Sequence, residues 1–474
     1  MQSVAAAVAR LDELADSPVV AELARVFADA GHELAIVGGP VRDAFLGRPV
    51  TDLDFTTDAR PDRILELVTP ISSAQWDVGR AFGTIAARVR GETVEITTYR
   101  ADSYDGSTRK PEVRFGDSLD DDLARRDFTV NAMALALPQR RLVDPSNGVE
   151  HLLAARLTTP GTPEQSFGDD PLRMLRAARF SAQLGFDVDE DVMQAMTAMG
   201  DRLAIVSVER ITDELTKLLR ADRPRRGIEL LVETGLAERV LPEIPALRLE
   251  IDEHAHHKDV YEHSLTVLDQ AIDLERSRGH EAPDLVLRLA ALLHDIGKPA
   301  TKRVEPGGAV SFHHHDVVGS KLATKRLKAL RFDNDTVASV ARLIELHLRF
   351  FGYTEGAWTD SAVRRYVRDA GPLLERLHIL TRADVTTRNR RKADRLAFAY
   401  DDLEQRIEHL QKEEELAAIR PDLNGDDIQR VLGIRPGREV GEAYRFLMEL
   451  RLDEGPLGPD EAERRLRAWW DARA

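Results

Sequence analysis

The chain has 474 residues, which corresponds to two to four domains at about 100 to 200 residues per domain. Its 66 Lys and Arg stand against 82 Asp and Glu, so the formal charge is −16, and no cysteine is present. Disulfides, cysteine-ligated zinc and thiol nucleophiles are therefore excluded. The sequence contains no run of about 18 apolar residues and no signal-peptide pattern, so we expect a cytoplasmic protein without a membrane span.

The first part of the chain is predicted to be an α+β domain. Its β-like runs lie at 33–37, 84–89, 93–99 and 128–137, and its helical patterns lie at 40–46 and 61–68. The stretch 104–117 is rich in Asp, Gly, Ser, Arg and Pro without periodicity, which indicates a loop.

The remainder is predicted to be almost entirely helical. Strand patterns nearly vanish after the turn at Asn147-Gly148, and apolar residues recur at helical spacing from 169 to 240. Pro242 and Pro245 mark a second boundary. We expect a head over 1–150, a helical neck over 151–245, a histidine-rich domain over 246–395 and a helical tail over 396–474.

A glycine pair follows the first β-like run, in the segment IVGGPVRD at 36–43. Adjacent glycines let backbone N–H groups approach a ligand closely, and the amino end of the following helix adds a positive dipole, which together suit a phosphate. The same pattern also fits an ordinary tight turn from strand to helix.

Two carboxylates, Asp52 and Asp54, come ten residues after Arg42 in the run TDLDFTT. On a strand this spacing points both to one face, where they can share one or two Mg²⁺ ions with substrate phosphates. The nearby glycine turn makes this pair more specific than an isolated Asp-x-Asp. Glu95, on a neighbouring predicted strand, is either a third carboxylate or an ordinary exposed residue.

Five motifs then occur in a fixed order: GGPVRD (38–43), DLD (52–54), RRDFTVNAMA (125–134), DPSNG (144–148) and DDPLRMLRAARF (169–180). They resemble those of the bacterial class II tRNA nucleotidyltransferases and poly(A) polymerases, which share a polymerase-beta-like palm, over roughly half of the chain. The resemblance implies that Gly38, Gly39 and Arg42 hold a nucleoside triphosphate. It implies that Asp52 and Asp54 bind the catalytic metals, and that Arg126, Asp127 and Asn131 lie against ribose and triphosphate.

The same resemblance assigns the reading of the incoming base to Asp170 and Arg173. Residues three apart on a helix share a face, and a carboxylate accepts hydrogen bonds where a guanidinium donates them, so this pair can mimic the edge of a template base. Arg176 and Arg179 continue the series toward the triphosphate.

A structural interpretation of the same segment remains open. Asp170 before Pro171 fits a helix cap, and Asp170 with Arg173 fits a surface ion pair. The family usually has Glu-Asp where this chain has Asp169-Asp170, which leaves the role of Asp169 open.

Ten of the fourteen histidines fall between 254 and 347, and this bias points to a metal site. The candidate ligands are His263, His294, Asp295, His315, His347 and Asp384. Imidazole and carboxylate suit Mg, Mn, Fe, Ni or Zn, so the set could hold one metal or a bridged pair. It resembles the HD phosphohydrolase domain. The remaining histidines of this region that flank the candidates are expected to be solvated: His254, His256, His257, His313 and His314.

The stretch 382–395 carries six Lys and Arg against two Asp. It fits either a contact with an RNA backbone or a solvated helix face with local ion pairs.

Together, these patterns predict an enzyme that adds C, C and A to the 3′ end of tRNA from CTP and ATP without a template. Mg²⁺ on Asp52 and Asp54 would serve the transfer, and no protein general base is required. The HD domain would hold a divalent transition metal or Mg²⁺. Its metal, its activity and the oligomeric state stay open.

Three alternatives are kept. Poly(A) polymerases share the head but commonly end in a basic tail without an HD domain, whereas this tail is acidic. A partial enzyme would add only A or only CC. The loop residues Tyr104, Asp105, Arg109, Lys110 and Pro111 resemble the flexible loop of complete and A-adding enzymes, which disfavours the CC-only version. An HD phosphohydrolase with a merely nucleotide-binding head does not explain the Asp52 and Asp54 pair.

Overall fold

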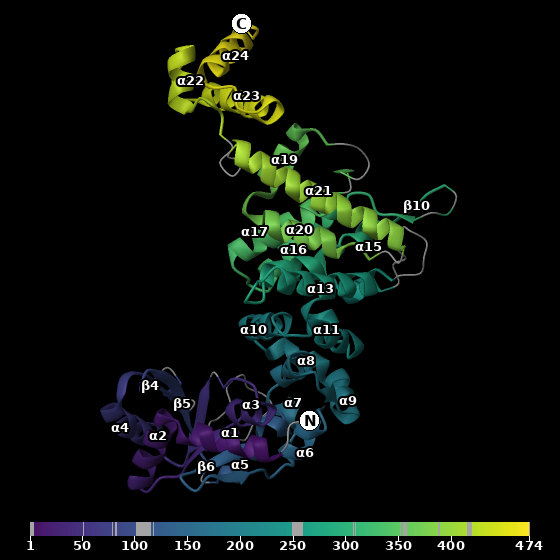
Figure 1. Ribbon diagram of the computed structural model, residues 1–474. Helices are drawn as coiled ribbons and strands as arrows, with labels where there is room; N and C mark the ends of the chain where they lie inside the picture. Colours follow the sequence, from purple (N-terminus) through teal and green to yellow (C-terminus); the bar gives the residue numbers. More distant parts are fainter. Residues whose placement is uncertain are drawn as a thin grey trace. The chain divides into compact units, whose positions relative to one another are not determined.

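The computed structural model describes residues 4–50, 52–77, 79–80, 83–100, 115–116, 118–248, 259–306, 308, 310–350, 352–353, 358–386, 389–414 and 420–473. The chain forms two compact units, Met1–Val240 and Leu241–Ala474 (Figure 1). Among the described helices, none combines the length and the hydropathy that crossing a membrane requires.

The first unit is built on a seven-stranded mixed sheet with the order β3-β4-β5-β2-β1-β6-β7. Its strands are β1 (Leu34–Val37), β2 (Leu53–Thr57), β3 (Ser72–Trp76), β4 (Thr84–Val89), β5 (Glu92–Thr98), β6 (Ala134–Leu137) and β7 (Arg141–Val143). β2 runs parallel to β5, and every other neighbouring pair is antiparallel. The middle strand β2 is therefore hydrogen-bonded to a neighbour on each side, and this pairing fixes the positions of the residues on β2.

Six helices belong to this part of the unit: α1 (Val4–Asp16), α2 (Pro18–Asp29), α3 (Gly39–Leu46), α4 (Pro61–Val68), α5 (Leu119–Ala124) and α6 (Gly148–Leu153). The DPSNG motif starts α6, because the Asp144 carboxylate accepts the N–H groups of Gly148 and Val149 at 2.6 and 2.9 Å. A Cβ at Gly148 would collide with the Thr129 carbonyl oxygen, so this close approach requires glycine.

The helical part of the first unit contains α7 (Pro163–Asp169), α8 (Leu172–Leu184), α9 (Glu190–Met199), α10 (Val208–Leu219), α11 (Pro224–Glu233) and α12 (Ala237–Val240), with the short strands β8 (Arg156–Leu157) and β9 (Asp187–Val188). α8 packs against both α10 and α11 and is buried on most of its surface. α11 approaches closely because a Cβ at Gly227 would lie 2.6 Å from the Ala178 carbonyl oxygen.

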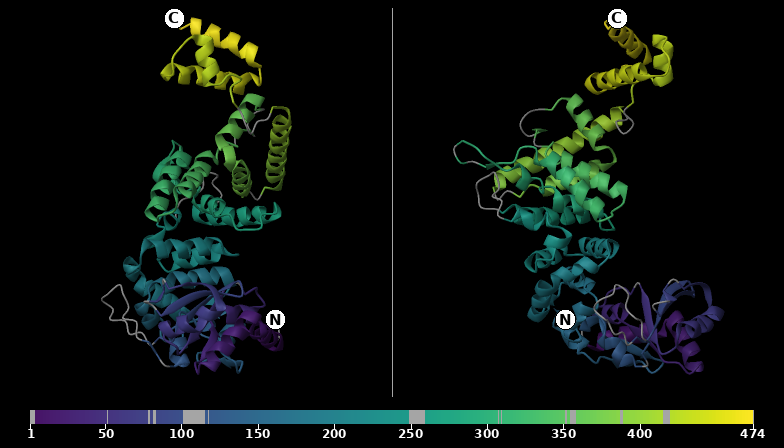
Figure 2. Two further views of the ribbon diagram at one scale, coloured as in Figure 1. Left: turned by 90° about the vertical axis from the view of Figure 1, so that its left-hand side faces the viewer. Right: turned by 180° about the vertical axis from the view of Figure 1, so that it is seen from behind.

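Among the residues that the structure describes, the second unit is helical apart from one small hairpin, β10 (Arg303–Val304) and β11 (Val310–Ser311) (Figures 1 and 2). Its helices are α13 (Val260–Ser277), α14 (Leu285–Leu293), α15 (Lys298–Thr301), α16 (His315–Ala329), α17 (Asn334–Leu346), α19 (Asp360–Ala370), α20 (Leu374–Ala383), α21 (Arg390–Glu414), α22 (Gly425–Leu432), α23 (Arg438–Glu454) and α24 (Pro459–Asp471). α13, α14, α17 and α20 pack together. The last three helices share a small core of their own.

Short 3₁₀ turns complete the fold: η1 (Thr69–Ile71), η3 (Thr129–Asn131), η4 (Gly200–Ile205), η5 (Pro245–Leu247) and η6 (Gly371–Leu373).

The predicted α+β head followed by a helical remainder is confirmed, and the predicted helices at 40–46 and 61–68 coincide with α3 and α4. The strand prediction over 128–137 was wrong in its first half, where η3 replaces it and β6 begins only at Ala134. Polar contacts of Asp127 and Asn131 compete there with sheet pairing. Most of the predicted loop at 104–117, including Tyr104 to Pro111, lies outside the described residues. The four domain ranges remain predictions.

Candidate active site and metal centre

A group of carboxylates lies on and beside the central strand β2 of the first unit. Asp54 on β2 is in register with Glu95 on the parallel strand β5, so the two side chains point to the same face of the sheet. Asp52 precedes β2 by one residue and stays exposed. Burial and the charges of Glu95 and Asp52 raise the pKa of Asp54 to about 6, against the opposing charge of Arg126. Crowded oxygen donors of this kind fit a divalent cation, which would offset their mutual repulsion.

The glycine turn lies next to Arg126. Gly38 has φ 73°, the left-handed region that favours glycine, and its N–H donates to the Met133 carbonyl oxygen at 3.2 Å. A Cβ at Gly38 would lie 3.2 Å from Arg126 Nη1, so the absent side chain leaves space for this guanidinium. Arg126 Nη2 also lies 3.2 Å from the buried carboxylate of Asp122, which orients it. Gly39 begins α3, with Pro40 in its first turn as predicted.

A buried polar network connects α3 with α8. Arg42 donates to Asn131 Oδ1 at 2.7 Å and to both oxygens of Asp43 at 2.9 Å. Asn131 donates to Asp127 Oδ1 at 3.0 Å, and Asp127 Oδ2 lies 2.7 Å from Arg176 Nη2. Burial acts to raise the pKa of Asp127, but Arg176 and the Asn131 hydrogen bond outweigh it, so the pKa is lowered. These groups are therefore held in fixed orientations before any ligand binds.

The network ends on a carboxylate that sequence reasoning missed. Glu214 of α10 is buried, with Oε2 2.6 Å from Arg179 Nε and Oε1 3.5 Å from Arg176 Nη1. The guanidinium carbons of Arg42, Arg176 and Arg179 lie 5.3, 5.4 and 4.0 Å from the centre of the Phe180 ring. A signal was available, because Glu214 falls on the apolar face of α10 that Leu218 also occupies.

The two residues predicted to read the base, Asp170 and Arg173, form hydrogen bonds with different partners. Asp170 Oδ1 accepts the N–H of Leu172 at 3.1 Å, as a cap does, and Oδ2 lies 2.7 Å from Arg210 Nη2. Arg173 donates from Nη1 to Ser166 Oγ at 2.9 Å and from Nη2 to the Arg125 carbonyl oxygen at 2.6 Å. The helix-cap interpretation therefore accounts for Oδ1 of Asp170 only. The ion-pair interpretation was wrong in its partner, because Asp170 pairs with Arg210 and not with Arg173. Asp169 is the last residue of α7.

The second unit brings all six candidate metal ligands together. They are His263 in α13, His294 and Asp295 at the end of α14, His315 at the start of α16, His347 after α17 and Asp384 after α20. They form two groups of three, His263 with His294 and Asp384, and Asp295 with His315 and His347, in each of which the possible ligand atoms lie within 4.8 Å of one another. The arrangement fits one divalent ion or a bridged pair.

Hydrogen bonds at the far side of each ring orient these histidines. The Nδ1 atoms of His294, His315 and His347 lie 2.9, 2.8 and 2.6 Å from backbone carbonyl oxygens, so each carries its proton there. His263 Nδ1 lies 3.0 Å from Thr386 Oγ1. The Nε2 lone pairs are thereby available to a metal, as in well-formed metal sites.

The electrostatics of this cluster also fit a bound cation. Burial alone would raise the pKa values of Asp295 and Asp384, yet the surrounding cationic groups hold both well below their usual range. Burial likewise opposes protonation of His294, but Asp295 and Asp384 raise its pKa to about 10. Lys298, which sequence reasoning missed, places Nζ 2.9 Å from Asp295 Oδ2. Without a metal, protons on the histidines and the Lys298 ammonium balance the two carboxylates, and a divalent cation would take the place of those protons.

The flanking histidines differ from the cluster. His313 and His314 are exposed, as expected, whereas His254, His256 and His257 lie outside the described residues.

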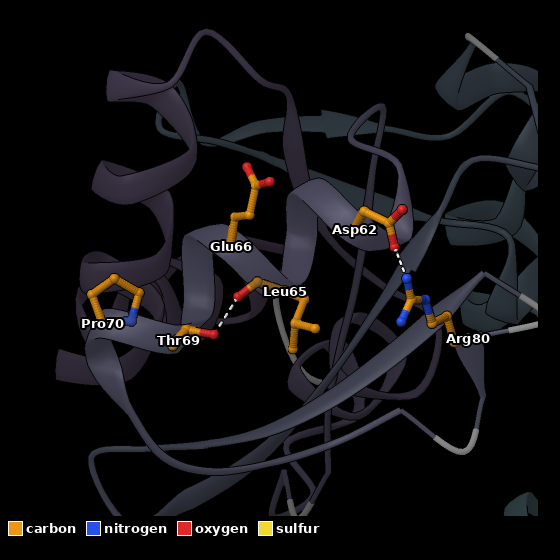
Figure 3. A pocket seen from close by; sticks show the side chains of 6 residues that line it. All are labelled: Asp62, Leu65, Glu66, Thr69, Pro70 and Arg80. Atoms are coloured by element: carbon orange, nitrogen blue, oxygen red, sulfur yellow. Dashed lines mark hydrogen bonds and ion pairs between the residues drawn. The ribbon is translucent and has the colours of Figure 1, made fainter.

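A shallow hollow lies beside α4 in the first unit (Figure 3). It is lined by Asp62, Leu65, Glu66, Thr69, Pro70 and Arg80. An ion pair between Asp62 and Arg80 borders it. None of the predicted site residues lines this hollow.

A glycine turn and paired carboxylates on the central strand of a mixed sheet, with a separate histidine and aspartate centre, define a nucleotidyltransferase of the palm type that carries an HD domain. Residues 34–158 match the family model of the poly A polymerase head domain. Residues 185–247 match the model of the probable RNA and SrmB-binding site of polymerase A, and residues 260–389 match the HD domain.

Relatives and solved structures agree with this class. The A-adding tRNA nucleotidyltransferase of Deinococcus radiodurans is 35% identical over 445 residues, which cover 92% of this chain and 95% of the relative. The CCA-adding enzyme of Bacillus subtilis is 40% identical over 217 residues, which cover 46% of this chain and 53% of that enzyme. The chain therefore belongs to the family of bacterial tRNA nucleotidyltransferases and poly(A) polymerases, as the motifs predicted.

The fold is also similar to that of a solved enzyme of this family. The crystal structure of the Bacillus stearothermophilus CCA-adding enzyme in complex with CTP matches with a TM-score of 0.66 and 25% identity, over 96% of this chain and 99% of that one.

Proposed function

We propose that this chain adds C, C and A to the 3′ end of tRNA from CTP and ATP, without a nucleic acid template. The observation that carries the proposal is the register of Asp54 with Glu95. Asp52 lies two residues before Asp54, and Arg126 lies beside the glycine turn. Crowded carboxylates next to a phosphate-binding turn are the donor set of a metal-assisted phosphoryl transfer.

The head residues would divide the work. Asp52 and Asp54 would hold divalent metal, most simply Mg²⁺, with Glu95 beside them. The bound metal supplies a lowered pKa for the RNA 3′-hydroxyl and charge neutralisation at the triphosphate. The backbone of Gly38 and Gly39, together with Arg126 and Arg176, would bind phosphates.

Base selection is proposed for Asp170 and Arg173. The carboxylate can only accept and the guanidinium can only donate, which matches the amino group and ring nitrogen of both cytosine and adenine. Uracil and guanine present a carbonyl where the amine is needed and an N–H where the acceptor is needed. Arg173 donates to the Arg125 carbonyl oxygen and to Ser166 Oγ, and Arg210 donates to Asp170. These hydrogen bonds support the role, because they hold both side chains in one orientation.

A second candidate function, addition of the terminal A alone, is favoured by one observation. An A-adding enzyme matches this chain over nearly its whole length, whereas three CCA-adding relatives match over about half of their own length at 40 to 42% identity.

One experiment separates the two. Purified protein is incubated with tRNA ending before the CCA and with tRNA ending in CC, each with CTP alone, ATP alone or both, and the products are sequenced. Complete CCA on the first substrate supports the main proposal. Addition restricted to A on the CC-ended substrate supports the second candidate. No addition to either, under conditions in which tRNA binds, refutes both.

For the second unit we propose that the six clustered side chains hold one or two divalent metals and hydrolyse a phosphate ester. Oxygen and imidazole donors, oriented Nε2 atoms and the buried Asp295 and Asp384 support this. We also propose the cytoplasm as the site of action, since tRNA is the substrate.

A further inference from the structure

The basic stretch 382–395 separates into two kinds of residue. Arg382 turns inward, where it lies 2.8 Å from Asp401 and 3.1 Å from Glu404 and its guanidinium lies 5.0 Å from the Tyr400 ring centre. By contrast, the first two turns of α21 expose Arg390, Arg391, Lys392 and Arg395. Within the part of the chain that the structure describes, no carboxylate pairs with these four cations, and a single acid, Asp394, lies among them. Ion pairs therefore explain the position of Arg382, whereas the four cations at the start of α21 can contact a ligand.

An exposed aromatic ring lies on the same face of α21. Phe398 has 73% of its surface exposed, although it is a large apolar residue. Arg391, Arg395 and Phe398 follow one another at spacings of four and three, so they form one stripe along the helix. Leu396 and Tyr400 face the opposite way and are buried. The stripe therefore has no role in packing α21 against its own unit.

The start of α21, which carries this stripe, lies near the HD cluster along the chain. α21 packs against α19 and α20 (Figure 1), and α20 ends directly before Asp384. The hydroxyl of Thr386 contacts His263 of the cluster. Arg390 is four residues after Thr386, so the Cα atoms of Arg390 and Thr386 are at most about 14 Å apart. A polymer bound along the stripe would thus pass close to the cluster.

We propose that the stripe of Arg391, Arg395 and Phe398 on α21 binds tRNA, with the arginines on backbone phosphates and the ring stacked on an unpaired base. The inference rests on the proposed function, because it takes tRNA as the substrate. Unpaired cations beside an exposed aromatic ring are the chemistry of single-stranded RNA recognition. An acidic protein partner would use the cations but gives no reason for the exposed ring.

The test measures equilibrium binding of tRNA to the full chain at several salt concentrations, without nucleotides. Arg391→Gln with Arg395→Gln removes two phosphate contacts, so affinity falls and the slope of log affinity against log salt becomes shallower by roughly 1.4 to 1.8. Phe398→Ala lowers affinity roughly 5- to 150-fold through lost stacking, whereas Phe398→Tyr keeps it.

Lys412→Gln is the matched control, because Lys412 is an exposed cation of the same helix that already pairs with Glu408 at 2.7 Å. It leaves affinity and slope unchanged. Wild-type affinity and slope in the double arginine variant, or equal binding by the Ala and Tyr variants of Phe398, overturn the inference and leave the stripe to a protein partner. Failure of the wild-type chain to bind tRNA at all counts against the proposed function instead.

Discussion

Glu214 of α10 and Arg179 of α8 form a buried ion pair, with Oε2 and Nε 2.6 Å apart. The same carboxylate reaches Arg176, which pairs with Asp127. Asp127 accepts a hydrogen bond from Asn131, whose side-chain oxygen accepts one from Arg42. One acid on a helix of the neck thereby supports a series of groups that ends at the glycine turn of the head.

We expect Glu214→Gln to lower the free energy of unfolding by about 3 to 5 kcal/mol, because it leaves Arg179 buried without its counter-charge. Nucleotide addition in the folded variant should fall mainly through a higher KM for the nucleotide, since the arginines lose their orientation. Denaturant unfolding and steady-state kinetics measure these two effects. Asp213→Asn is the control, because the exposed Asp213 and Lys217 pair on the same helix contributes at most about 0.5 kcal/mol.

The carboxylates on β2 and β5 give a second prediction. Asp54→Asn should lower nucleotide addition by at least about a hundredfold while tRNA still binds, because it removes a proposed metal ligand from the transfer step. Glu95→Gln should raise the Mg²⁺ concentration needed for half-maximal rate. Glu92→Gln, an exposed change on the same strand, should alter neither quantity. A Mg²⁺ dependence identical in the Glu95 and Glu92 variants would leave Glu95 as an ordinary strand residue.

Base selection can be separated from helix capping at Asp170. Asp170→Ser keeps a side chain that caps α8, but it removes the carboxylate that is proposed to accept from the amino group. Mispaired polar groups cost about 1 to 3 kcal/mol each, so the preference for CTP over UTP should fall roughly 5- to 150-fold. Single-nucleotide addition kinetics measure it. A Ser variant that still rejects UTP as the wild type does would reduce Asp170 to a cap.

Arg210→Gln tests the partner of Asp170 in the same assay. Arg210 Nη2 holds Asp170 Oδ2, so its loss should weaken discrimination, by less than the loss of Asp170 itself. Arg202→Gln is the matched control, because Arg202 supports the same segment through the Gly168 carbonyl oxygen at 2.9 Å. Equal effects of both changes on the CTP and UTP ratio would show that Arg210 only stabilises the fold.

The two metal sites should be separable. His294→Ala with Asp295→Ala should lose bound transition metal, measured by elemental analysis, and any metal-dependent phosphate ester hydrolysis, while CCA addition stays largely intact. The reason is that the two sets of ligands lie in different compact units. His313→Ala, at an exposed histidine, should retain metal and both activities. Parallel loss of hydrolysis and nucleotide addition in a folded double variant would contradict this.

The local predictions succeeded where neighbouring residues determine structure. The β-like run and glycine pair at 34–39 gave β1 and the start of α3, since a left-handed Gly38 and a proline in the first helical turn act within a few residues. The helical spacing of apolar residues after 169 also gave the correct class of structure. The prediction failed at 128–133, where Asp127 and Asn131 bond to each other instead of extending a strand.

Ordered motifs in the sequence by themselves determined the family and the six residues of the HD cluster, because residue types and spacings carry that information directly. The shared role of Asp52 and Asp54 remains a prediction from the same motifs. Tertiary structure alone decided the partners. Glu95 joins Asp54 through the parallel pairing of β2 with β5, Glu214 reaches Arg179 across 35 residues, and Arg210 reaches Asp170 across 40. Such contacts depend on which strands pair and which helix faces pack, and this is set by burial of apolar surface over the whole unit, which no local spacing encodes.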